Sequence, residues 1–275
     1  FFIKLIHIAS LTMFLAIPFP NIDPVLVSLG PIAIRWYALA YLLGLVLGWR
    51  LLRRKAAFSS NSFKEDHADD ILLWLIVGII IGGRLGYVIF YNFSYFLANP
   101  LKILATWEGG MSFHGGLLGV VILSLIYCRR HKLEPLALGD MLACVAPIGL
   151  FFGRLANFVN GELYGRETDL TWGVIFPRGG PNPRHPSQIY EAFLEGFALF
   201  IIINIMWKFE SIRECRGVLT GTFIAGYAIA RMVAEFFRQP DAHIGFLALG
   251  GTMGQWLSLP MLAVGLGLII QGVRR

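Results

Sequence analysis

Seven runs of about 20 mostly apolar residues divide this chain, and a run of that length lets an α-helix cross the hydrocarbon core of a bilayer. The chain has 275 residues, of which 56% are hydrophobic and only 15% are charged, whereas a typical soluble domain has about 25% charged residues. The sequence therefore predicts an all-α integral membrane protein with about seven transmembrane helices. We expect the spans at Pro31–Trp49, Ile71–Phe90, Phe113–Tyr127, Leu136–Phe152, Ser187–Trp207, Val218–Phe236 and Thr252–Ile270.

The basic residues between these runs gather on one side of the predicted membrane. If the spans alternate in direction, thirteen of the 23 Lys and Arg residues fall on the same side. Loops rich in Lys and Arg are usually cytoplasmic, so we expect a periplasmic N-terminus and a cytoplasmic C-terminus. The formal net charge of +6 then faces anionic lipid, which argues against nucleic-acid binding. The thirteen are Arg50, Arg53, Arg54, Lys55, Lys64, Arg129, Arg130, Lys132, Lys208, Arg213, Arg216, Arg274 and Arg275.

The beginning of the chain differs from the rest. Residues 1–22 contain a short apolar run interrupted by Lys4 and His7, and we expect an N-terminal extension that forms an interfacial helix. A remnant of a signal peptide and a translated extension are the alternatives. Residues 23–275 are expected to form a single transmembrane domain, in which the 154–186 connection is a substrate region on the periplasmic side.

Further arginines lie within the bilayer or near its outer face, where a charged side chain at a helix centre costs about 2.5–3.5 kcal/mol. They could pair with internal carboxylates and only hold helices together. However, the arginines outnumber the carboxylates near them, and an arginine fork suits a phosphate. The excess predicts a central polar cavity, open to the outer leaflet, that binds phospholipid phosphate. The arginines are Arg84, Arg154, Arg166, Arg178, Arg184, Arg231 and Arg238, and the carboxylates are Asp140, Glu162, Glu191, Glu195 and Glu235.

The stretch GRLANFVNGELYG, residues 153–165, concentrates hydrogen-bonding groups in an apolar context. Arg154, Asn157 and Asn160 are spaced three residues apart, so they share one face if the helix continues that far. Together they form a possible cradle for a phosphate and its glycerol hydroxyls. Glu162 could orient the arginine or accept a hydroxyl hydrogen bond, and Gly165 suits a turn.

The stretch ARMVAEFFRQPD places Arg231, Glu235 and Arg238 on one face, at spacings of four and three residues. One interpretation is a stripe in which the carboxylate satisfies both arginines. The other is that one carboxylate between two arginines leaves positive charge over, which would contact a second side of the same phosphate.

His114 lies where a glycine-bracketed turn enters the third span, in WEGGMSFHGGLLG. A histidine at a helix start is often a capping or packing residue. The flanking glycines leave space for a substrate beside the imidazole, and its ordinary pKa near 6.5 suits proton acceptance. Ser112, two residues away, is badly placed to form a Ser-His pair with it.

Three more residues are candidates for the site, and two of them, His185 and Glu191, are expected to form its walls. His185 precedes Pro186 and could cap the fifth span, and Glu191 one turn later would face His185 or an arginine. Tyr37 either anchors the first span in the aromatic belt or bonds a lipid headgroup. Metal-binding, Walker and GxSxG patterns are missing, and Cys128, Cys144 and Cys215 are widely spaced packing candidates, so we expect neither a metal nor a cofactor.

Five motifs, in order along the chain, together resemble the bacterial prolipoprotein diacylglyceryl transferases, from about Asp23 to the C-terminus. The family's signature usually has Gly where this chain has Ala156, which is a mild departure. The motifs are GGRLGYVIFYN (Gly82–Asn92), GGMSFHGG (Gly109–Gly116), GRLANFVNGELYG (Gly153–Gly165), RHPSQIYE (Arg184–Glu191) and EFFRQPD (Glu235–Asp241).

The resemblance implies a seven-span enzyme of the bacterial inner membrane with its active site at the periplasmic leaflet. Such an enzyme transfers the diacylglyceryl group of phosphatidylglycerol to the lipobox cysteine thiol of a prolipoprotein and releases glycerol 1-phosphate, the first step of lipoprotein maturation. These two substrates are the expected partners, and a monomer is favoured. In the family the residue matching Arg154 contacts phosphatidylglycerol. Residues associated with activity match Tyr37, His114, Asn157, Glu162, Gly165, Arg231 and Glu235.

We expect His114 to act as the base for the thiol, and Arg154 and Arg231 to hold the leaving phosphate. A lipid or anion transporter would also need internal arginines, but it predicts inverted repeats that the sequence does not show convincingly. A structural subunit would bind the lipid without turnover. The residues expected to bind substrate are Tyr37, Arg84, Arg154, Asn157, Asn160, Glu162, Gly165, His185, Glu191, Arg231, Glu235 and Arg238.

Overall fold

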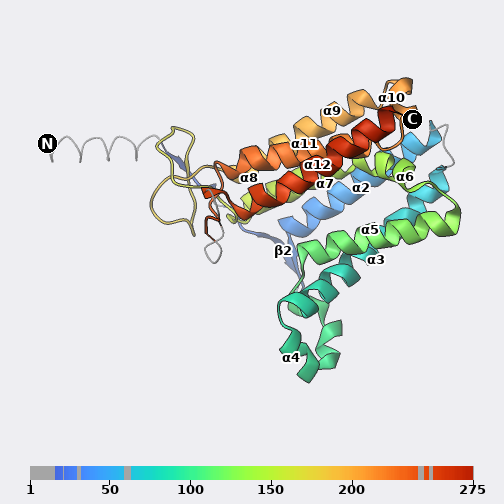
Figure 1. The fold of residues 1–275 in the computed structure, drawn as a ribbon. Coiled ribbons are helices and arrows are strands. Elements are labelled where there is room, and N and C mark those ends of the chain that lie inside the picture. The colour runs from blue at the N-terminus through green and yellow to red at the C-terminus, as the bar shows by residue number, and fades with distance from the viewer. Residues whose placement is uncertain are drawn as a thin grey trace, which may run out of the picture. The chain divides into compact units, whose positions relative to one another are not determined.

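The protein is mostly helical, as the apolar runs predicted, and Figure 1 shows the course of its helices. The structure is a computed structural model that describes residues 16–20, 22–29, 32–58, 63–240, 245–247 and 250–274. Most of the predicted interfacial helix, residues 1–15 and 21, lies outside the described residues. The chain divides into two compact units: a first unit of residues 1–48 and 143–275, and a second unit of residues 49–142.

Among the described residues, five helical segments are long and apolar enough to cross a membrane, and a sixth span results if α6 and α7 count as one. These findings confirm an apolar, multi-helix membrane architecture. The five segments are α3 (Glu65–Phe90), α5 (Phe113–His131), Ser187–Met206, α11 (Val218–Glu235) and α12 (Met253–Val273), and the pair is α6 (Pro135–Ala143) with α7 (Ala146–Val159).

Helix α2 (Trp36–Ala57) occupies the region of the first predicted span but with different bounds. It begins later than predicted because residues Ile32–Arg35 form strand β3, which pairs antiparallel with β2 (Val25–Leu29). It also continues further, and its last turn carries Arg54 and Lys55, where positive charge interacts favourably with the helix dipole. Aromatic and basic residues lower its hydropathy, and it is not among the helices that are apolar enough throughout to cross a membrane by composition alone.

Two predicted spans contain irregular helix. The fourth run breaks between α6 and α7, where Pro147 stands in the first turn of α7 and has no N–H with which to continue the helix from α6. The fifth run is continuous but changes type: α8 (Ser187–Glu191) passes into a π-helical segment, η3 (Ala192–Ala198), and then into α9 (Leu199–Met206). Such π segments often occur at functional sites.

In the first unit, α11 packs along α12, while α7 packs on η3 (Figure 1). The approach of α11 to α12 depends on small residues, because a Cβ at Gly221 would lie 2.6 Å from the carbonyl oxygen of Gly265. A buried apolar cluster supports the same unit and consists of Ala143, Cys144, Leu199, Ile203 and Leu219.

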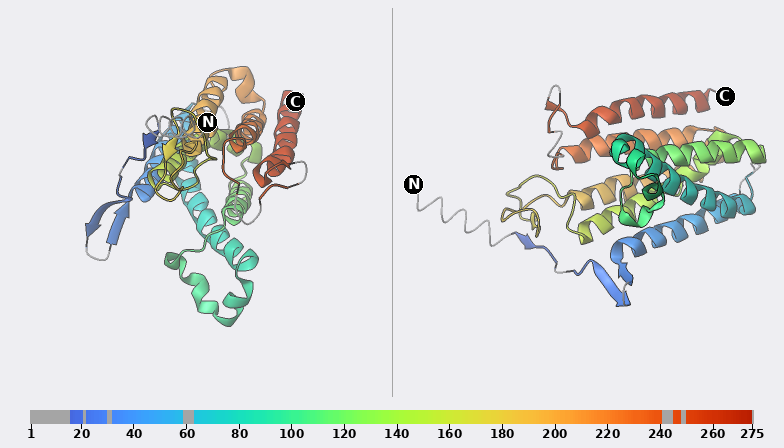
Figure 2. Two further views of the ribbon diagram at one scale, coloured as in Figure 1. Left: turned by 90° about the vertical axis from the view of Figure 1, so that its left-hand side faces the viewer. Right: turned by 90° about the horizontal axis from the view of Figure 1, so that it is seen from below.

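In the second unit, α3 and α5 lie against each other. A Cβ at Gly82 would lie 2.4 Å from the carbonyl oxygen of Gly115 and 2.8 Å from the Cα of Gly119, so the two backbones are in contact there. The chain between them projects from the end of α3 (Figure 2). It contains α4 (Phe93–Ala98) and the 3-10 turns η1 (Pro100–Leu104) and η2 (Thr106–Glu108).

The 160–186 connection of the first unit is held by short backbone pairings. Strand β4 (Val174–Ile175) pairs parallel with β1 (Ile17–Pro18), and single bridges join Gly165 to Arg238 and Glu167 to Arg184. The connection is thereby fixed to the segment that follows α11. The remaining short helix, α10 (Glu210–Glu214), lies between α9 and α11.

Candidate active site

Arg154 of α7 reaches into a group of buried carboxylates. Its Nε and Nη2 donate to Oε2 of Glu195, at 3.1 and 2.9 Å, and its Nη1 lies 3.0 Å from Oε2 of Glu191. Both glutamate side chains are fully buried, whereas the arginine side chain keeps 16% of its surface exposed. Part of the Arg154 side chain is therefore accessible, although the two carboxylates that it contacts are not.

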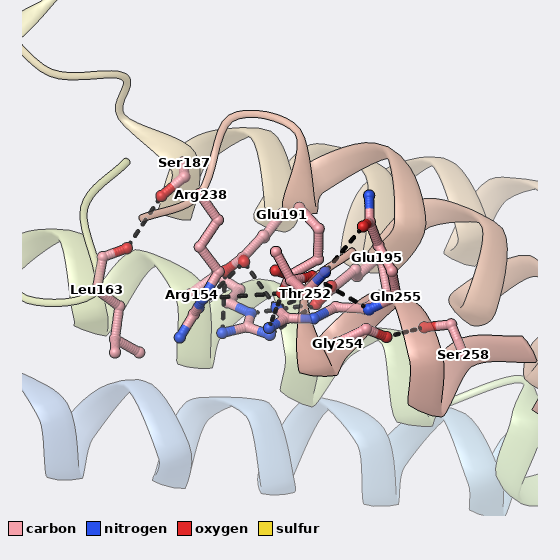
Figure 3. Close-up of polar contacts among 12 residues, drawn as sticks. Arg154, Leu163, Ser187, Glu191, Glu195, Arg238, Thr252, Gly254, Gln255 and Ser258 are labelled. Carbon is pink, nitrogen blue, oxygen red and sulfur yellow. Dashed lines mark hydrogen bonds and ion pairs between the residues drawn. The ribbon is translucent and has the colours of Figure 1, made fainter. Parts of the chain in front are cut away.

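The end of α11 contributes two more arginines to the same place. Oε1 of Glu191 accepts from Nη1 of Arg231 at 2.8 Å and from Nη1 of Arg238 at 3.2 Å. Glu235 lies 2.5 Å from Nη2 of Arg231 and 3.9 Å from Nε of Arg238. Figure 3 shows Arg154, Arg238, Glu191 and Glu195 turned toward one another, with dashed contacts between them. We use the name arginine–glutamate cluster for six residues: Arg154, Arg231, Arg238, Glu191, Glu195 and Glu235.

The charge balance of this cluster corrects a premise of the sequence analysis. Three arginines meet three glutamates, so the cluster has no excess positive charge when all six groups are ionised. The excess of arginines over carboxylates lies outside the cluster. Arg166 donates to the carbonyl oxygens of Arg238 and Glu235, at 2.9 and 3.2 Å, and Arg178 donates to that of Asn160. Neither has a carboxylate contact within the part of the chain that the structure describes.

Hydrogen-bond capacity remains at Arg154 even though its charge is matched. A guanidinium has five N–H groups, and the hydrogen bonds to Glu195 occupy the one on Nε and one on Nη2. The contact of Nη1 with Glu191 is an ion pair at 3.0 Å without hydrogen-bond geometry. At least one N–H on each terminal nitrogen therefore has no hydrogen-bond partner among the described residues. Two such donors match the spacing of two phosphate oxygens.

The polar residues after Arg154 form a second group. Oε1 of Glu162 accepts from the side-chain amides of Asn157 and Asn160, at 2.9 and 3.2 Å, so the three predicted residues come together. Helix α7 ends at Val159, and the Nε2 of Gln188 holds the backbone carbonyl of Glu162. Among the described residues, no contact joins Glu162 to Arg154, so the structure does not support the alternative that Glu162 orients this arginine.

Gly165 allows two backbones to approach closely. A Cβ there would lie 2.4 Å from the carbonyl oxygen of Phe237 and 2.7 Å from Cβ of His185. Its N–H donates to the carbonyl of His185 at 2.8 Å. The position therefore fixes the connection against the residues next to Arg238, and any side chain would disturb that arrangement.

His185 and Tyr37 lie beside this region. Nδ1 of His185 lies 3.2 Å from the hydroxyl of Tyr190, and burial, with the charge of Arg166, lowers the pKa of His185. It therefore stays neutral to a lower pH than a free histidine. The Tyr37 hydroxyl donates to that of Tyr41 at 3.0 Å.

The two predicted site residues of the second unit have different surroundings. All five N–H groups of Arg84 donate to backbone carbonyls of the 102–110 segment, and its side chain is buried. His114 is exposed, and its ring packs edge-on against Phe113 with 5.7 Å between centroids. Ser112 caps α5 by accepting from the N–H of Gly115. The substrate-binding role of Arg84 and the proton-accepting role of His114 stay predictions.

Sequence reasoning missed Glu195 as a site residue, although it counted that carboxylate. The missing information was which helices meet. A signal was present, because two carboxylates four residues apart in an apolar span, Glu191 and Glu195, both need a buried partner. Across the described residues, no group of three His, Cys, Asp or Glu side chains is arranged to hold a metal ion.

Comparison with known proteins gives a consistent result. The sequence model of the family described as prolipoprotein diacylglyceryl transferase matches residues 24–271. A protein from Rhodospirillum rubrum named phosphatidylglycerol–prolipoprotein diacylglyceryl transferase is 56% identical over 256 residues, which cover 92% of this chain and 93% of the relative. Two relatives with the same name come from Paramagnetospirillum magneticum, 53% identical over 264 residues (96% and 98%), and Azospirillum brasilense, 54% identical over 263 residues (95% and 98%).

Proposed function

The chain belongs to the prolipoprotein diacylglyceryl transferase family, and from this premise we propose that it transfers the diacylglyceryl group of phosphatidylglycerol to a prolipoprotein, the first step of lipoprotein maturation. The acceptor is the thiol of the lipobox cysteine. A carbon–sulfur bond forms at the glycerol carbon that carries phosphate, and the carbon–oxygen bond to that phosphate breaks. The products are the thioether-linked lipoprotein precursor and glycerol 1-phosphate.

One observation supports the phosphate site in particular: both terminal nitrogens of Arg154 have N–H groups without a hydrogen-bond partner among the described residues, and its side chain is 16% exposed. As the carbon–oxygen bond breaks, negative charge grows on the leaving phosphate. Fixed donors aimed at that charge lower the barrier because they need no reorganisation during the reaction. The carboxylates of Glu191 and Glu195 already hold the guanidinium, so the fork is oriented before the lipid arrives.

The other predicted residues complete the proposal. Arg231 contacts the phosphate from a second side, and Glu191, Glu235 and Arg238 hold the arginines. The amides of Asn157 and Asn160, with Glu162 and the Tyr37 hydroxyl, offer hydrogen bonds to the headgroup glycerol. Gly165 and His185 shape the wall, and Arg84 contributes as a further binding residue.

Proton removal is assigned to His114. A cysteine thiol has an ordinary pKa near 8.5, so only a few per cent is thiolate at pH 7. A positioned imidazole is the most common general base in enzymes, and it can take the proton as the carbon–sulfur bond forms. The thiol proton passes to the imidazole while sulfur attacks carbon. No step of the proposed reaction uses a metal or a cofactor.

The enzyme is proposed to cross the bacterial inner membrane seven times. Helix α2 is the first span, α6 with α7 the fourth, and the N-terminus lies in the periplasm. In this topology the cluster faces the periplasmic leaflet, where a polar cavity open to lipid admits phosphatidylglycerol. Residues 23–275 act as one catalytic domain and as a monomer, with the 154–186 connection as the periplasmic substrate region.

A direct assay tests the proposal. Purified protein is mixed with labelled phosphatidylglycerol and a lipobox peptide, and thioether product and glycerol phosphate are measured. The wild type is expected to form both in equal amounts. Arg154→Ala is expected to lower transfer by at least about 100-fold, the effect of losing one donor aimed at a growing charge.

The matched control is Glu210→Gln, which removes an exposed carboxylate that lies 4.0 Å from Arg213 and should leave transfer unchanged. Thermal unfolding in detergent verifies that Arg154→Ala is folded. Full activity in the folded Arg154→Ala protein would exclude the phosphate site described above. Lipid binding without product in the wild type would instead favour a structural lipid-binding subunit.

A further inference from the structure

Glu195 has an unusually specific contact within the arginine–glutamate cluster. Its Oε2 accepts from both Nε and Nη2 of Arg154, at 3.1 and 2.9 Å. Its other oxygen lies 3.8 Å from Nη1 of Arg231, beyond hydrogen-bond distance. The side chain is fully buried. Its hydrogen bonds among the described residues therefore all go to one edge of the Arg154 guanidinium.

The local packing explains why this contact forms. Glu195 lies in the π-helical segment η3, and the next residue is Gly196. A Cβ at Gly196 would lie 2.6 Å from Cβ and 2.7 Å from Cα of Phe151, so η3 touches the backbone of α7 there. Phe151 is three residues before Arg154, about one helical turn away. The glycine thereby brings the carboxylate of η3 against the arginine of α7.

Glu191 has a different task from Glu195. It contacts all three arginines of the cluster and acts as their shared counter-charge. Glu195 accepts two hydrogen bonds on the Nε side of Arg154, and this contact fixes the rotation of the guanidinium plane. With that edge held, the remaining N–H groups of Nη1 and Nη2 keep one direction.

We infer that Glu195 is a positioning residue for transfer: it aligns the free fork of Arg154 with the phosphate of phosphatidylglycerol. The inference rests on the proposed function. Glu195 does not touch the substrate, and it acts through Arg154. Its loss should therefore weaken stabilisation of the departing phosphate more than it weakens binding of the lipid.

The kinetic parameters of two variants test this role. Glu195→Gln keeps an oxygen at the same place without the charge, and Glu195→Ala removes the contact. We expect kcat to fall about tenfold in the Gln variant and about 100-fold in the Ala variant, as for one weakened and one lost charge-assisted hydrogen bond. KM for phosphatidylglycerol should stay within about threefold, because the arginine still meets the bound anion.

Controls separate alignment from folding. Glu210→Gln should retain the wild-type kcat, and thermal unfolding in detergent shows which variants fold. A folded Gln variant with kcat within twofold of wild type, or a change confined to KM, would overturn the inference. Failure of both variants to fold would also overturn it, since Glu195 would then act on stability. A wild-type protein without transfer would refute the proposed function instead.

Discussion

A single buried carboxylate organises most of the candidate site. Glu191 accepts from Arg231 and Arg238 through one oxygen and lies against Arg154 through the other. Removing one partner from a buried ion pair commonly costs about 3–5 kcal/mol, because the remaining charge is left without compensation. Substitution of Glu191 would therefore report on folding as well as chemistry. Residues at the margin of the cluster give cleaner tests.

Gly254 is such a residue. A Cβ there would lie 2.4 Å from Oε1 and 2.6 Å from Cδ of Glu235, so Gly254→Ala must displace the carboxylate that pairs with Arg231. A side-chain end moves more easily than backbone. We therefore expect a small loss of stability, about 1 kcal/mol, and a larger loss of transfer, about tenfold, because Arg231 loses its orientation.

Gly267→Ala is the matched control, since it lies in the same helix and a Cβ there has no atom within 4 Å. It should keep activity and gain slightly in stability from the higher helix propensity of alanine. Transfer rates and melting temperatures in one detergent provide the comparison. Equal activity in both alanine variants would show that displacement of Glu235 does not matter for turnover.

At the scale of elements, glycines determine how closely the helices of the second unit approach. Along α3, Gly78, Gly82 and Gly86 meet the backbone of α5 at Gly115 and Gly119, where added Cβ atoms would lie 2.2–3.0 Å from main-chain atoms. Small residues at such spacing are a common basis of helix association in membranes, because apolar burial gives little advantage in lipid. Stability there comes from backbone contact.

Gly82→Ala tests that contact. The added Cβ would meet the carbonyl oxygen of Gly115 at 2.4 Å, and backbone cannot move aside as a side chain can. We expect a loss of about 2 kcal/mol or more in the free energy of unfolding. Gly116→Ala is the control, because its Cβ would be 3.6 Å from the nearest atom, an ordinary contact. Indistinguishable melting temperatures for the two variants would contradict this description of the helix pair.

For the whole molecule, the seven-span topology is the prediction with the widest consequences. A green fluorescent protein fused after residue 274 should fluoresce, because the C-terminus is predicted to be cytoplasmic. Alkaline phosphatase inserted at residue 171 should be active, because the 154–186 connection is predicted to be periplasmic. Expression blots of both fusions control for abundance. The opposite pattern would place the arginine–glutamate cluster at the wrong leaflet for a reaction on a secreted substrate.

Hydropathy predicted where helices occur because it reports how much apolar surface each segment offers to lipid. Among the described residues, six of the seven predicted spans overlap a helical segment, or a bent pair of helices, that is long and apolar enough to cross a membrane. The break before α7 was missed, although Pro147 could have indicated it. The strand Ile32–Arg35 was also missed, because its apolar residues continue the first span without interruption.

Site prediction was limited in a different way. Spacing placed Arg231, Glu235 and Arg238 on one face, and the structure brings them together with Arg154. Spacing within a helix carries no information on which helix lies opposite. The hydrogen bonds between Glu195 and Arg154 depend on the close approach of η3 to α7. The sequence alone did not predict that these two helices lie together.

The surroundings of Arg84 have a consequence for behaviour in acid. Its partners are the main-chain carbonyls of residues 102, 103, 105, 109 and 110. A carbonyl does not take up protons in water, and a guanidinium keeps its charge at any acidity that a cell envelope meets. The loop between α3 and α5 is consequently fastened by groups that do not respond to acidification. The hydrogen bonds that Arg84 makes to this loop should therefore persist at an acidic pH that weakens ion pairs with carboxylates.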